Sequence, residues 1–158
     1  MSRGSDVNRP KRVLAISSAG GHWVQLRRLL PAFDGFDVAF ASVFPAYAQD
    51  VPGSRFHVFD DVSRFHKARM PRVIFQIFSI LMSERPDVVI TTGSAPGLIA
   101  LALSKLLFRS QTIWIDSIAN CEQLSSSGLR ARRFADVWLT QWNHLAGKDG
   151  PDFWGATL

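Results

Sequence analysis

The sequence predicts an α/β fold, in which a parallel sheet is covered by helices on both faces. Three observations lead to this prediction. Short apolar runs alternate with segments of helical periodicity, the runs are continuously apolar, and glycine-rich turns follow two of them. Strands that are buried on both faces have such continuous apolar sequences, and parallel strands need helical connections between them. The sequence shows no internal repeat.

Each expected element follows from its own local pattern. The strands are expected at residues 12–16, 36–43, 56–59, 88–90, 112–115 and 137–140, and the third is weak because it is short and flanked by polar residues. The helices are expected at residues 22–33, after Pro71, at 98–108 and at 129–134. One face of the helix that Pro71 opens is apolar and comprises Met70, Val73, Ile74, Ile77, Phe78 and Leu81.

Length and composition limit the class of protein. A chain of 158 residues with 47% hydrophobic residues can form one domain with its own core, which excludes global disorder. A single cysteine, Cys121, excludes a disulfide scaffold. We expect a flexible basic leader at residues 1–12 and a single domain at 13–158. No signal peptide or membrane-spanning segment is recognisable, so a cytoplasmic protein, soluble or peripheral, is expected.

The formal charge of +5 allows two interpretations. A basic protein can bind nucleic acid, but no nucleic-acid-binding module is recognisable. Alternatively, the basic residues precede an apolar helix that carries Phe75, Phe78 and Leu81, and such a segment can lie on an anionic membrane. These basic residues are Arg64, Lys67, Arg69 and Arg72. The other explanation for this segment is a core helix that follows a solvated basic loop.

The candidate ligand-binding loops follow the predicted strands, because ligands bind at the carboxyl ends of open parallel sheets. The first loop contains Ser18, Gly20 and Gly21, and it leads into a helix whose free N–H groups could bind a phosphate. It matches neither the dinucleotide fingerprint nor a P-loop. His22 lies in the first helical turn, where the positive helix end favours the neutral imidazole that a general base needs. A plain tight turn and a merely polar first-turn residue are the alternatives.

Two further loops carry polar side chains. The second contains Thr92, Gly93 and Ser94, and the third, at residues 116–128, contains Asp116, Ser117, Asn120 and Glu122. Asp116 and Glu122 could act as acid, base or hydroxyl binder. The alternative is a solvated loop with Ser127 as a helix N-cap. The four histidines are scattered, so no metal site is expected, and Cys121 has no evident base.

Four motifs in order resemble the asparagine-linked-glycosylation-fourteen family. Residues 17–26, SSAGGHWVQL, resemble its opening S-S/G-G-G-H-x-x-Q/E-L, and 85–93, RPDVVITTG, resemble its strand and turn P-D-V-V-I-x-x-G. Residues 115–142 are similar to its I-E-S…L-S-x-T-G…A-D-x-F-x-V-Q-W, and the tail at 153–158 resembles its closing Y-x-G-x-L. Asp116 stands where the family usually has Glu, and Asn120 lies near a common Arg. These departures bear on the acceptor preference.

The resemblance implies one half of an enzyme. Members of the family are acceptor-side subunits of split glycosyltransferases, related to the two-domain GT-B enzyme that makes peptidoglycan lipid II. This chain would be a Rossmann-like domain equivalent to the N-terminal half, and a separate subunit would bind the nucleotide sugar. Eukaryotic members carry an N-terminal membrane anchor that this sequence lacks, so it looks more like the bacterial exopolysaccharide and capsule members, such as the first component of two-part glucuronosyltransferases.

The resemblance also assigns expected roles to residues. The acceptor would be a polyprenyl-diphosphate-linked saccharide, with its diphosphate near Gly20 and Gly21, and His22 would be the base on the acceptor hydroxyl. The residues expected to be catalytic are His22, Asp116 and Glu122. Those expected to bind acceptor or diphosphate are Ser18, Gly20, Gly21, Thr92, Gly93, Ser94, Ser117 and Asn120. Those expected to contact the partner subunit are Gln141, Trp142, Trp154 and Gly155. No cofactor is expected.

Two other functions remain open at this point. The chain could be a non-catalytic module that recruits or activates a partner glycosyltransferase at the membrane. It could also be a free-standing nucleotide-binding protein, which the missing phosphate fingerprint disfavours.

Overall fold

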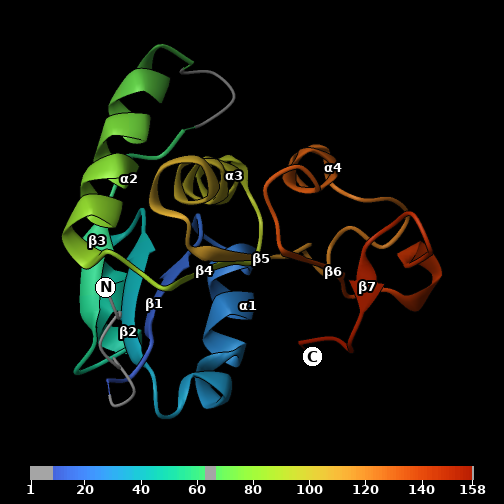
Figure 1. Ribbon diagram of the computed structural model, residues 1–158, viewed down its shortest axis with the longest axis horizontal. Helices are drawn as coiled ribbons and strands as arrows, with labels where there is room; N and C mark the ends of the chain where they lie inside the picture. The colour runs from blue at the N-terminus through green and yellow to red at the C-terminus, as the bar shows by residue number, and fades with distance from the viewer. Residues whose placement is uncertain (1–8, 63–66, 158) are drawn as a thin grey trace, which may run out of the picture.

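A computed structural model describes residues 9–62 and 67–157, without the side chain of Lys67. Within these residues, seven parallel strands form one sheet in the order β3-β2-β1-β4-β5-β6-β7 (Figure 1). The strands are β1 Arg12–Ile16, β2 Asp37–Ser42, β3 Arg55–Val58, β4 Val88–Thr91, β5 Gln111–Ile115, β6 Val137–Thr140 and β7 Asp152–Phe153. Every neighbouring pair is parallel, which confirms the predicted sheet.

Helices cover both faces of this sheet, as the sequence predicts. Three of them, α2, α3 and α4, lie on one face, and α1 lies on the other (Figure 1). Their bounds are α1 Gly21–Arg28, α2 Met70–Glu84, α3 Ala95–Leu103 and α4 Ser126–Ala131. Shorter helical turns are η1 Leu30–Phe33, η2 Pro45–Asp50, η3 Lys67–Arg69 and η5 Asn143–Leu145, and a π-helical segment, η4 Ser104–Phe108, continues α3.

The central strand β1 is buried on both faces, which explains its continuous apolar sequence. Leu14 and Ile16 belong to the core beneath α2, α3 and α4, whereas Val13 and Ala15 belong to the core beneath α1. Successive residues of a strand point to opposite faces, so both faces of β1 need apolar side chains.

The strand order creates a switch point between β1 and β4. From β1 the chain proceeds outward through β2 to β3, and it then returns to place β4 on the other side of β1. The loops after β1 and β4 therefore diverge at the carboxyl edge, and doubly wound sheets bind their ligands in the crevice so formed. The first and second candidate loops are these two loops.

Two predicted helices end differently in the structure. The expected helix at 22–33 stops as an α-helix at Arg28, and Leu30–Phe33 forms a 3₁₀ turn. Pro31 causes this change, because proline lacks an N–H and disfavours helical backbone in the residue before it. The expected helix at 98–108 begins earlier, at Ala95, and its last turn becomes the π-helical η4.

The N-cap of the fourth predicted helix is also different. The alternative interpretation of the third loop, as a solvated loop, makes Ser127 the cap, but Ser125 is the cap, because its hydroxyl accepts a hydrogen bond from the Gly128 N–H at 2.8 Å. The helix consequently begins at Ser126 and ends at Ala131. Any of the three consecutive serines at 125–127 could cap a helix, so residue type alone did not distinguish them.

The apolar face of α2 is narrower than predicted. Val73, Ile77 and Leu81 are buried as expected, and Ile80 joins them, but Ile74 is 39% exposed. Arg64 lies outside the described residues, as do residues 1–8 of the predicted leader. None of the helices in the described part of the chain is long and apolar enough to cross a membrane.

Candidate functional site at the carboxyl edge of the sheet

His22 and the second loop form the centre of the candidate site at the switch point. The His22 Nδ1 atom lies 3.0 Å from the backbone oxygen of Thr92, and the Thr92 hydroxyl donates a 2.7 Å hydrogen bond to the His22 carbonyl. A carbonyl oxygen only accepts, so Nδ1 must carry the proton of this bond. In the neutral imidazole, Nε2 is then an unprotonated nitrogen, and it makes no hydrogen bond within residues 9–62 and 67–157. This arrangement has the chemistry of a general base.

Gly93 lies against the imidazole and keeps it in position. Its φ of 121° is a backbone conformation that side chains rarely adopt, and a Cβ there would lie 2.8 Å from His22 Cε1. Glycine therefore serves here for two reasons, the conformation and the close approach of the ring. The structure thus brings His22, Thr92 and Gly93 together, although 70 residues separate the first two along the chain.

The glycine loop before α1 leaves the helix N-terminus uncapped by any side chain. Gly20 has a φ of 67° and donates its N–H to the Tyr47 hydroxyl at 3.2 Å. The Tyr47 ring stacks on Trp23, with ring centroids 4.8 Å apart. An uncapped helix N-terminus offers N–H groups and a positive dipole end to an anion, so the loop at Gly20 and Gly21 can receive a phosphate.

Ser94 and Ser18 flank this centre. Ser94 precedes α3 with a φ of 78°, and its buried hydroxyl has no hydrogen-bond partner within the described chain. The Ser18 backbone carbonyl accepts hydrogen bonds from the Ser17 and Ser42 hydroxyls. Ser18 therefore uses its backbone to hold the first loop, and its side chain is half-buried.

Asp116 organises the third loop from within. Its side chain is 2% exposed, and its carboxylate accepts hydrogen bonds from Trp114 Nε1, Asn120 Nδ2 and both the N–H and the hydroxyl of Ser125, at 2.6–3.2 Å. All four donors come from the same short segment of chain. A buried carboxylate needs such bonds to offset its lost hydration, so the geometry gives Asp116 a positioning role.

The remaining predicted residues of this loop differ in exposure. Ser117 is buried, and its hydroxyl accepts hydrogen bonds from Gln25 Nε2 and the Ala119 N–H. Glu122 is exposed and makes no hydrogen bond or ion pair with the described residues. The loop therefore contains two carboxylates in opposite environments.

The four predicted partner-contact residues also divide into two groups. Gln141 is 4% exposed and fully bonded within the chain, and Trp142 donates from Nε1 to the Ile118 carbonyl at 2.8 Å. By contrast, Trp154 is 71% exposed, and Gly155 beside it is exposed with a φ of 115°. Of the four residues, only Trp154 and Gly155 are therefore exposed, whereas Gln141 is buried and Trp142 is half-buried.

Sequence reasoning missed two residues that hold the site together. Tyr47, the only tyrosine of the chain, bonds to Gly20 from η2, a segment without a predicted element. Gln25 appeared only inside a motif, yet it bonds to both the first and the third loop. Its position three residues after His22, one helical turn away, could have indicated that it faces the same edge.

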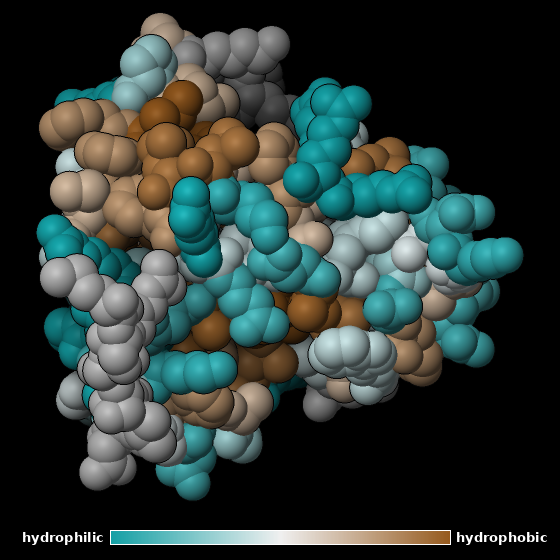
Figure 2. All heavy atoms as spheres, in the orientation of Figure 1, coloured by the Kyte–Doolittle hydropathy of each residue, from teal (hydrophilic) through white to brown (hydrophobic). Residues whose placement is uncertain are grey.

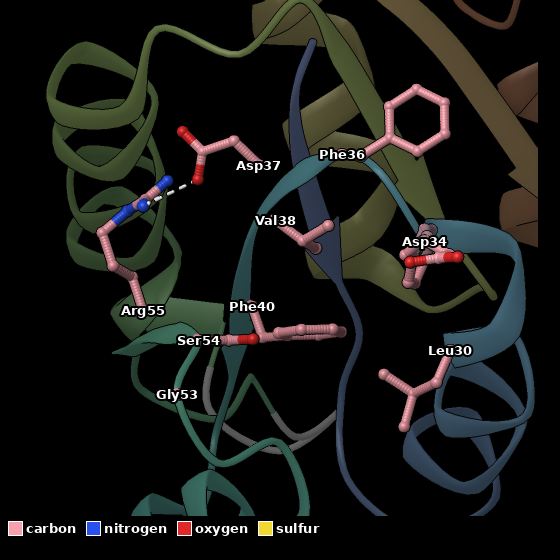
Figure 3. Close-up of a pocket in the computed structure, with 10 residues that line it drawn as sticks. Leu30, Asp34, Phe36, Asp37, Val38, Phe40, Gly53, Ser54 and Arg55 are labelled. Atoms are coloured by element: carbon pink, nitrogen blue, oxygen red, sulfur yellow. Dashed lines mark hydrogen bonds and ion pairs between the residues drawn. The ribbon is translucent and has the colours of Figure 1, made fainter. Parts of the chain in front are cut away.

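A cavity of about 380 Å³ lies at the opposite edge of the sheet, between η1 and the first residues of β2 and β3. Figure 3 shows Asp37 and Arg55 pointing toward one another on one side of it, and Asp34 on the other side near Leu30. Arg55 Nη1 donates to Asp37 Oδ1 at 2.9 Å. The hydrogen bond with Asp37 raises the pKa of Arg55, against an opposing effect of burial. Because this cavity lies where strands begin, it is separate from the switch-point site.

The described residues contain no group of three side chains able to hold a metal ion.

Comparison with known proteins identifies the family and the fold of the chain. A family model described as 'oligosaccharide biosynthesis protein Alg14 like' matches residues 62–157, more than half of the chain. The UDP-N-acetylglucosamine transferase subunit ALG14 of Eremothecium gossypii is 26% identical over 94% of this chain and 80% of its own length.

Two solved structures show the same fold. MurG of Acinetobacter baumannii has a TM-score of 0.74 at 13% identity and covers 94% of this chain, which spans 46% of MurG. A UDP-GlcNAc 2-epimerase of Methanocaldococcus jannaschii has a TM-score of 0.61 at 12% identity, and 39% of that chain is covered. These similarities confirm the predicted Rossmann-like domain, equivalent to the N-terminal half of a GT-B glycosyltransferase. By its sequence motifs and the family model, the chain belongs to the Alg14-like family of oligosaccharide biosynthesis proteins.

Proposed function

We propose that residues 13–158 form the acceptor-side subunit of a two-component inverting glycosyltransferase. It uses a UDP-sugar held by a separate subunit and a polyprenyl-diphosphate-linked saccharide, in exopolysaccharide, capsule or lipid-linked oligosaccharide synthesis. The observation that carries the proposal is the His22 imidazole, whose Nδ1–H donates to the Thr92 carbonyl while Nε2 stays free to accept a proton. A relative that this chain covers to 80% of its length is itself named a transferase subunit, which supports a two-component enzyme.

The proposed reaction assigns His22 one task. His22 Nε2 takes the proton of the acceptor hydroxyl as its oxygen attacks the anomeric carbon, and the bond from that carbon to UDP breaks. The anomeric configuration is thereby inverted, and no cofactor enters. The diphosphate of the acceptor lies at the uncapped N-terminus of α1, near Gly20 and Gly21. Asp116 holds the third loop that borders the acceptor.

Mixing experiments test whether sugar transfer requires both subunits. The purified chain alone should transfer little or no sugar, and addition of the nucleotide-sugar-binding subunit should restore transfer to a polyprenyl-diphosphate saccharide. The relative named as a UDP-N-acetylglucosamine transferase subunit makes UDP-N-acetylglucosamine the first donor to try. Full transfer by this chain without a second subunit would contradict the proposal.

An exposed apolar surface supports contact with the cytoplasmic face of a membrane. We name it the α2–η4 patch: Ile74, Phe75, Met82, Leu106 and Leu107, which are 39–69% exposed. Figure 2 shows hydrophobic residues gathered over α2. Exposed cations at the C-terminal ends of the same two elements, Arg85 and Arg109, complement an anionic bilayer, whereas Arg72 and Lys105 are paired with Asp60 and Asp136. This patch also favours the second candidate function, a non-catalytic module that recruits its partner to the membrane.

Vesicle binding tests the α2–η4 patch. Substitution of Phe75, Leu106 and Leu107 by serine should weaken binding to vesicles that contain phosphatidylglycerol, whereas the control Val24→Ser alters an exposed residue of α1, on the opposite face. Equal binding by both variants would remove the patch from the proposal. The non-catalytic alternative requires an intact complex whose transfer rate is unchanged by substitution of His22.

A further inference from the structure

Two buried glutamines connect the glycine loop, the third loop and the C-terminal tail. Gln25 on α1 and Gln141 after β6 are each 4% exposed, and Gln141 Nε2 donates to Gln25 Oε1 at 2.6 Å. They are 116 residues apart in sequence. A primary amide offers two donors and two acceptor positions, and both amides use all of theirs.

Gln25 joins the two loops that border the candidate site. Its Nε2 donates to the Gly21 carbonyl at 3.1 Å and to the Ser117 hydroxyl at 3.0 Å. Its Oε1 accepts from the Ile118 N–H at 3.0 Å, in addition to Gln141. One side chain therefore sets the distance between the glycine loop and the third loop.

Gln141 joins this pair to the tail. Its Oε1 accepts from both the N–H and the hydroxyl of Thr157, at 2.9 and 2.8 Å, and its Nε2 also donates to the Asp116 carbonyl at 2.9 Å. Arg28 Nη1 donates to the Thr157 carbonyl at 2.5 Å. The tail is thus fastened at Thr157, while Trp154, three residues earlier, is 71% exposed. Exposed tryptophan is a residue type enriched at the centres of protein interfaces.

The hydrogen bonds from Thr157 to Gln141 and from Gln141 to Gln25 all donate in the same direction. The Thr157 N–H can only donate, so the Gln141 oxygen must face the tail and its NH₂ group must face Gln25. The Gln25 oxygen must in turn face Gln141, and its NH₂ group must face Gly21 and Ser117. If the tail leaves, the Gln141 oxygen loses both of its donors, and the orientation of Gln141 is then held only by the bonds of its NH₂ group to the Asp116 carbonyl and to Gln25.

We propose that Gln25 is a positioning residue of the acceptor site, and that Gln141 couples the bonding of Gln25 to the docking of the tail. A partner subunit that binds at Trp154 and stabilises the tail thereby stabilises the acceptor-binding arrangement of both loops. Binding of the acceptor and binding of the partner then strengthen each other, as thermodynamic linkage requires. The inference rests on the proposed function and adds to it a mechanism by which the partner regulates the acceptor site.

Hydrogen exchange in the full-length chain tests the internal connection without partner or acceptor. Thr157→Val removes one donor from the tail. Gln141→Glu keeps the acceptors for Thr157 but removes both donors toward Gln25 and Asp116. Each variant should exchange the Ile118 amide hydrogen about fivefold faster than the parent, the effect of roughly one hydrogen bond. The control is Gln76→Met on α2, because within residues 9–62 and 67–157 Gln76 bonds only to Asp60. Exchange at Ile118 that is the same in all four proteins would overturn the proposal.

Binding measurements test the coupling itself. In the parent protein, a saturating polyprenyl-diphosphate acceptor should tighten partner binding roughly tenfold, and Gln25→Met or Gln141→Glu should reduce this factor to near one. Gln25→Met should also raise the KM for acceptor while leaving the KM for UDP-sugar unchanged, a separation that general loss of stability would not produce. If the parent complex transfers sugar but the acceptor does not tighten partner binding, this inference is overturned and the proposed function still stands. If no complex transfers sugar, the proposed function fails, and the exchange experiment still decides whether the tail controls the loop.

Discussion

The two edges of the sheet are built from different chemistry. At the amino-terminal edge, charged side chains join neighbouring strands or the segments before them, as Asp37 to Arg55 and Asp87 to Arg9 and Arg12, and Asp136 before β6 pairs with Lys105 of η4. At the carboxyl edge, the loops after β1, β4 and β5 are held by glycines, hydroxyls, amides and His22, and the buried carboxylate of Asp116 accepts hydrogen bonds from neutral donors. Ion pairs on this edge, Asp50 with Arg27 and Asp60 with Arg72, lie beyond the outer strands β2 and β3.

This difference separates stabilisation from ligand binding. Exposed ion pairs at the beginnings of strands each contribute little, but they help to hold the strands in register. Neutral donors and free N–H groups at the ends of strands leave the helix dipoles uncompensated, and these can then interact with an anionic acceptor. Substitutions at the carboxyl edge should therefore change turnover, whereas those at the amino-terminal edge should change stability slightly.

The largest effect is expected at His22. Loss of the proposed general base in His22→Ala should lower the rate of sugar transfer by the reconstituted complex about 10²–10⁴-fold, while partner binding persists. The control is His144→Ala, because His144 is exposed and bonds to the Cys121 carbonyl instead. A His22→Ala rate within a few-fold of the parent would place all of the chemistry on the partner subunit.

Asp116 and Glu122 form a matched pair of carboxylates in one loop. Asp116→Ala removes the acceptor of four hydrogen bonds and should lower the free energy of unfolding by about 2–4 kcal/mol, measured by urea denaturation. Glu122→Ala should unfold like the parent, because Glu122 is exposed and has no partner in the described structure. Equal losses in both variants would contradict the positioning role of Asp116.

Gly93 allows strain and site geometry to be separated. Alanine at Gly93 or at Gly53 must adopt a positive φ, so both variants should lose about 1–2 kcal/mol of stability. Only at Gly93 does the new Cβ meet the His22 ring, whereas no atom lies within 4 Å of a Cβ at Gly53. We expect turnover to fall about tenfold in Gly93→Ala alone, measured by transfer assays. A similar turnover in both variants would show that Gly93 does not position the imidazole.

The smallest expected effect is the loss of stability at low pH that comes from the carboxylates at the amino-terminal edge of the sheet. Burial works to raise the pKa of Asp87 and of Asp136, but hydrogen bonds from Arg12 and Arg9, and from Lys105 and Thr112, hold each pKa below its ordinary value. The stability that these carboxylates contribute is therefore present above about pH 4 and is lost as the pH falls through their folded pKa values.

Urea denaturation between pH 7 and pH 2 measures this contribution. Because both carboxylates are partly exposed, the loss should stay below about 1 kcal/mol for each. The variants Asp87→Asn and Asp136→Asn should show a weaker pH dependence, and the exposed control Asp149→Asn should behave like the parent. An unchanged acid dependence in the first two variants would show that these ion pairs do not stabilise the fold.

Local patterns predicted most of the elements. The apolar run at residues 12–16 coincides with β1, and Pro71 lies in the first turn of α2. The strand β7 escaped prediction, because two residues have no periodicity and Asp152–Phe153 is defined only by its pairing with Leu139–Thr140. The end of α1 was misplaced, because apolar spacing continues past Arg28 although Pro31 stops the helix.

The sequence by itself determined the fold class, the edge of the sheet that carries the site, and the residue types available there. Continuous apolar strands, glycine turns and residues such as His22 are local features, so they can be recognised along the chain. Only the tertiary structure decided how these residues are used. The bonds from His22 to Thr92 and from Gln25 to Gln141 join residues 70 and 116 positions apart, and the four bonds of Asp116 depend on the path of its loop. Hydrogen bonds between distant segments depend on how strands are ordered and paired, and no local pattern specifies that order.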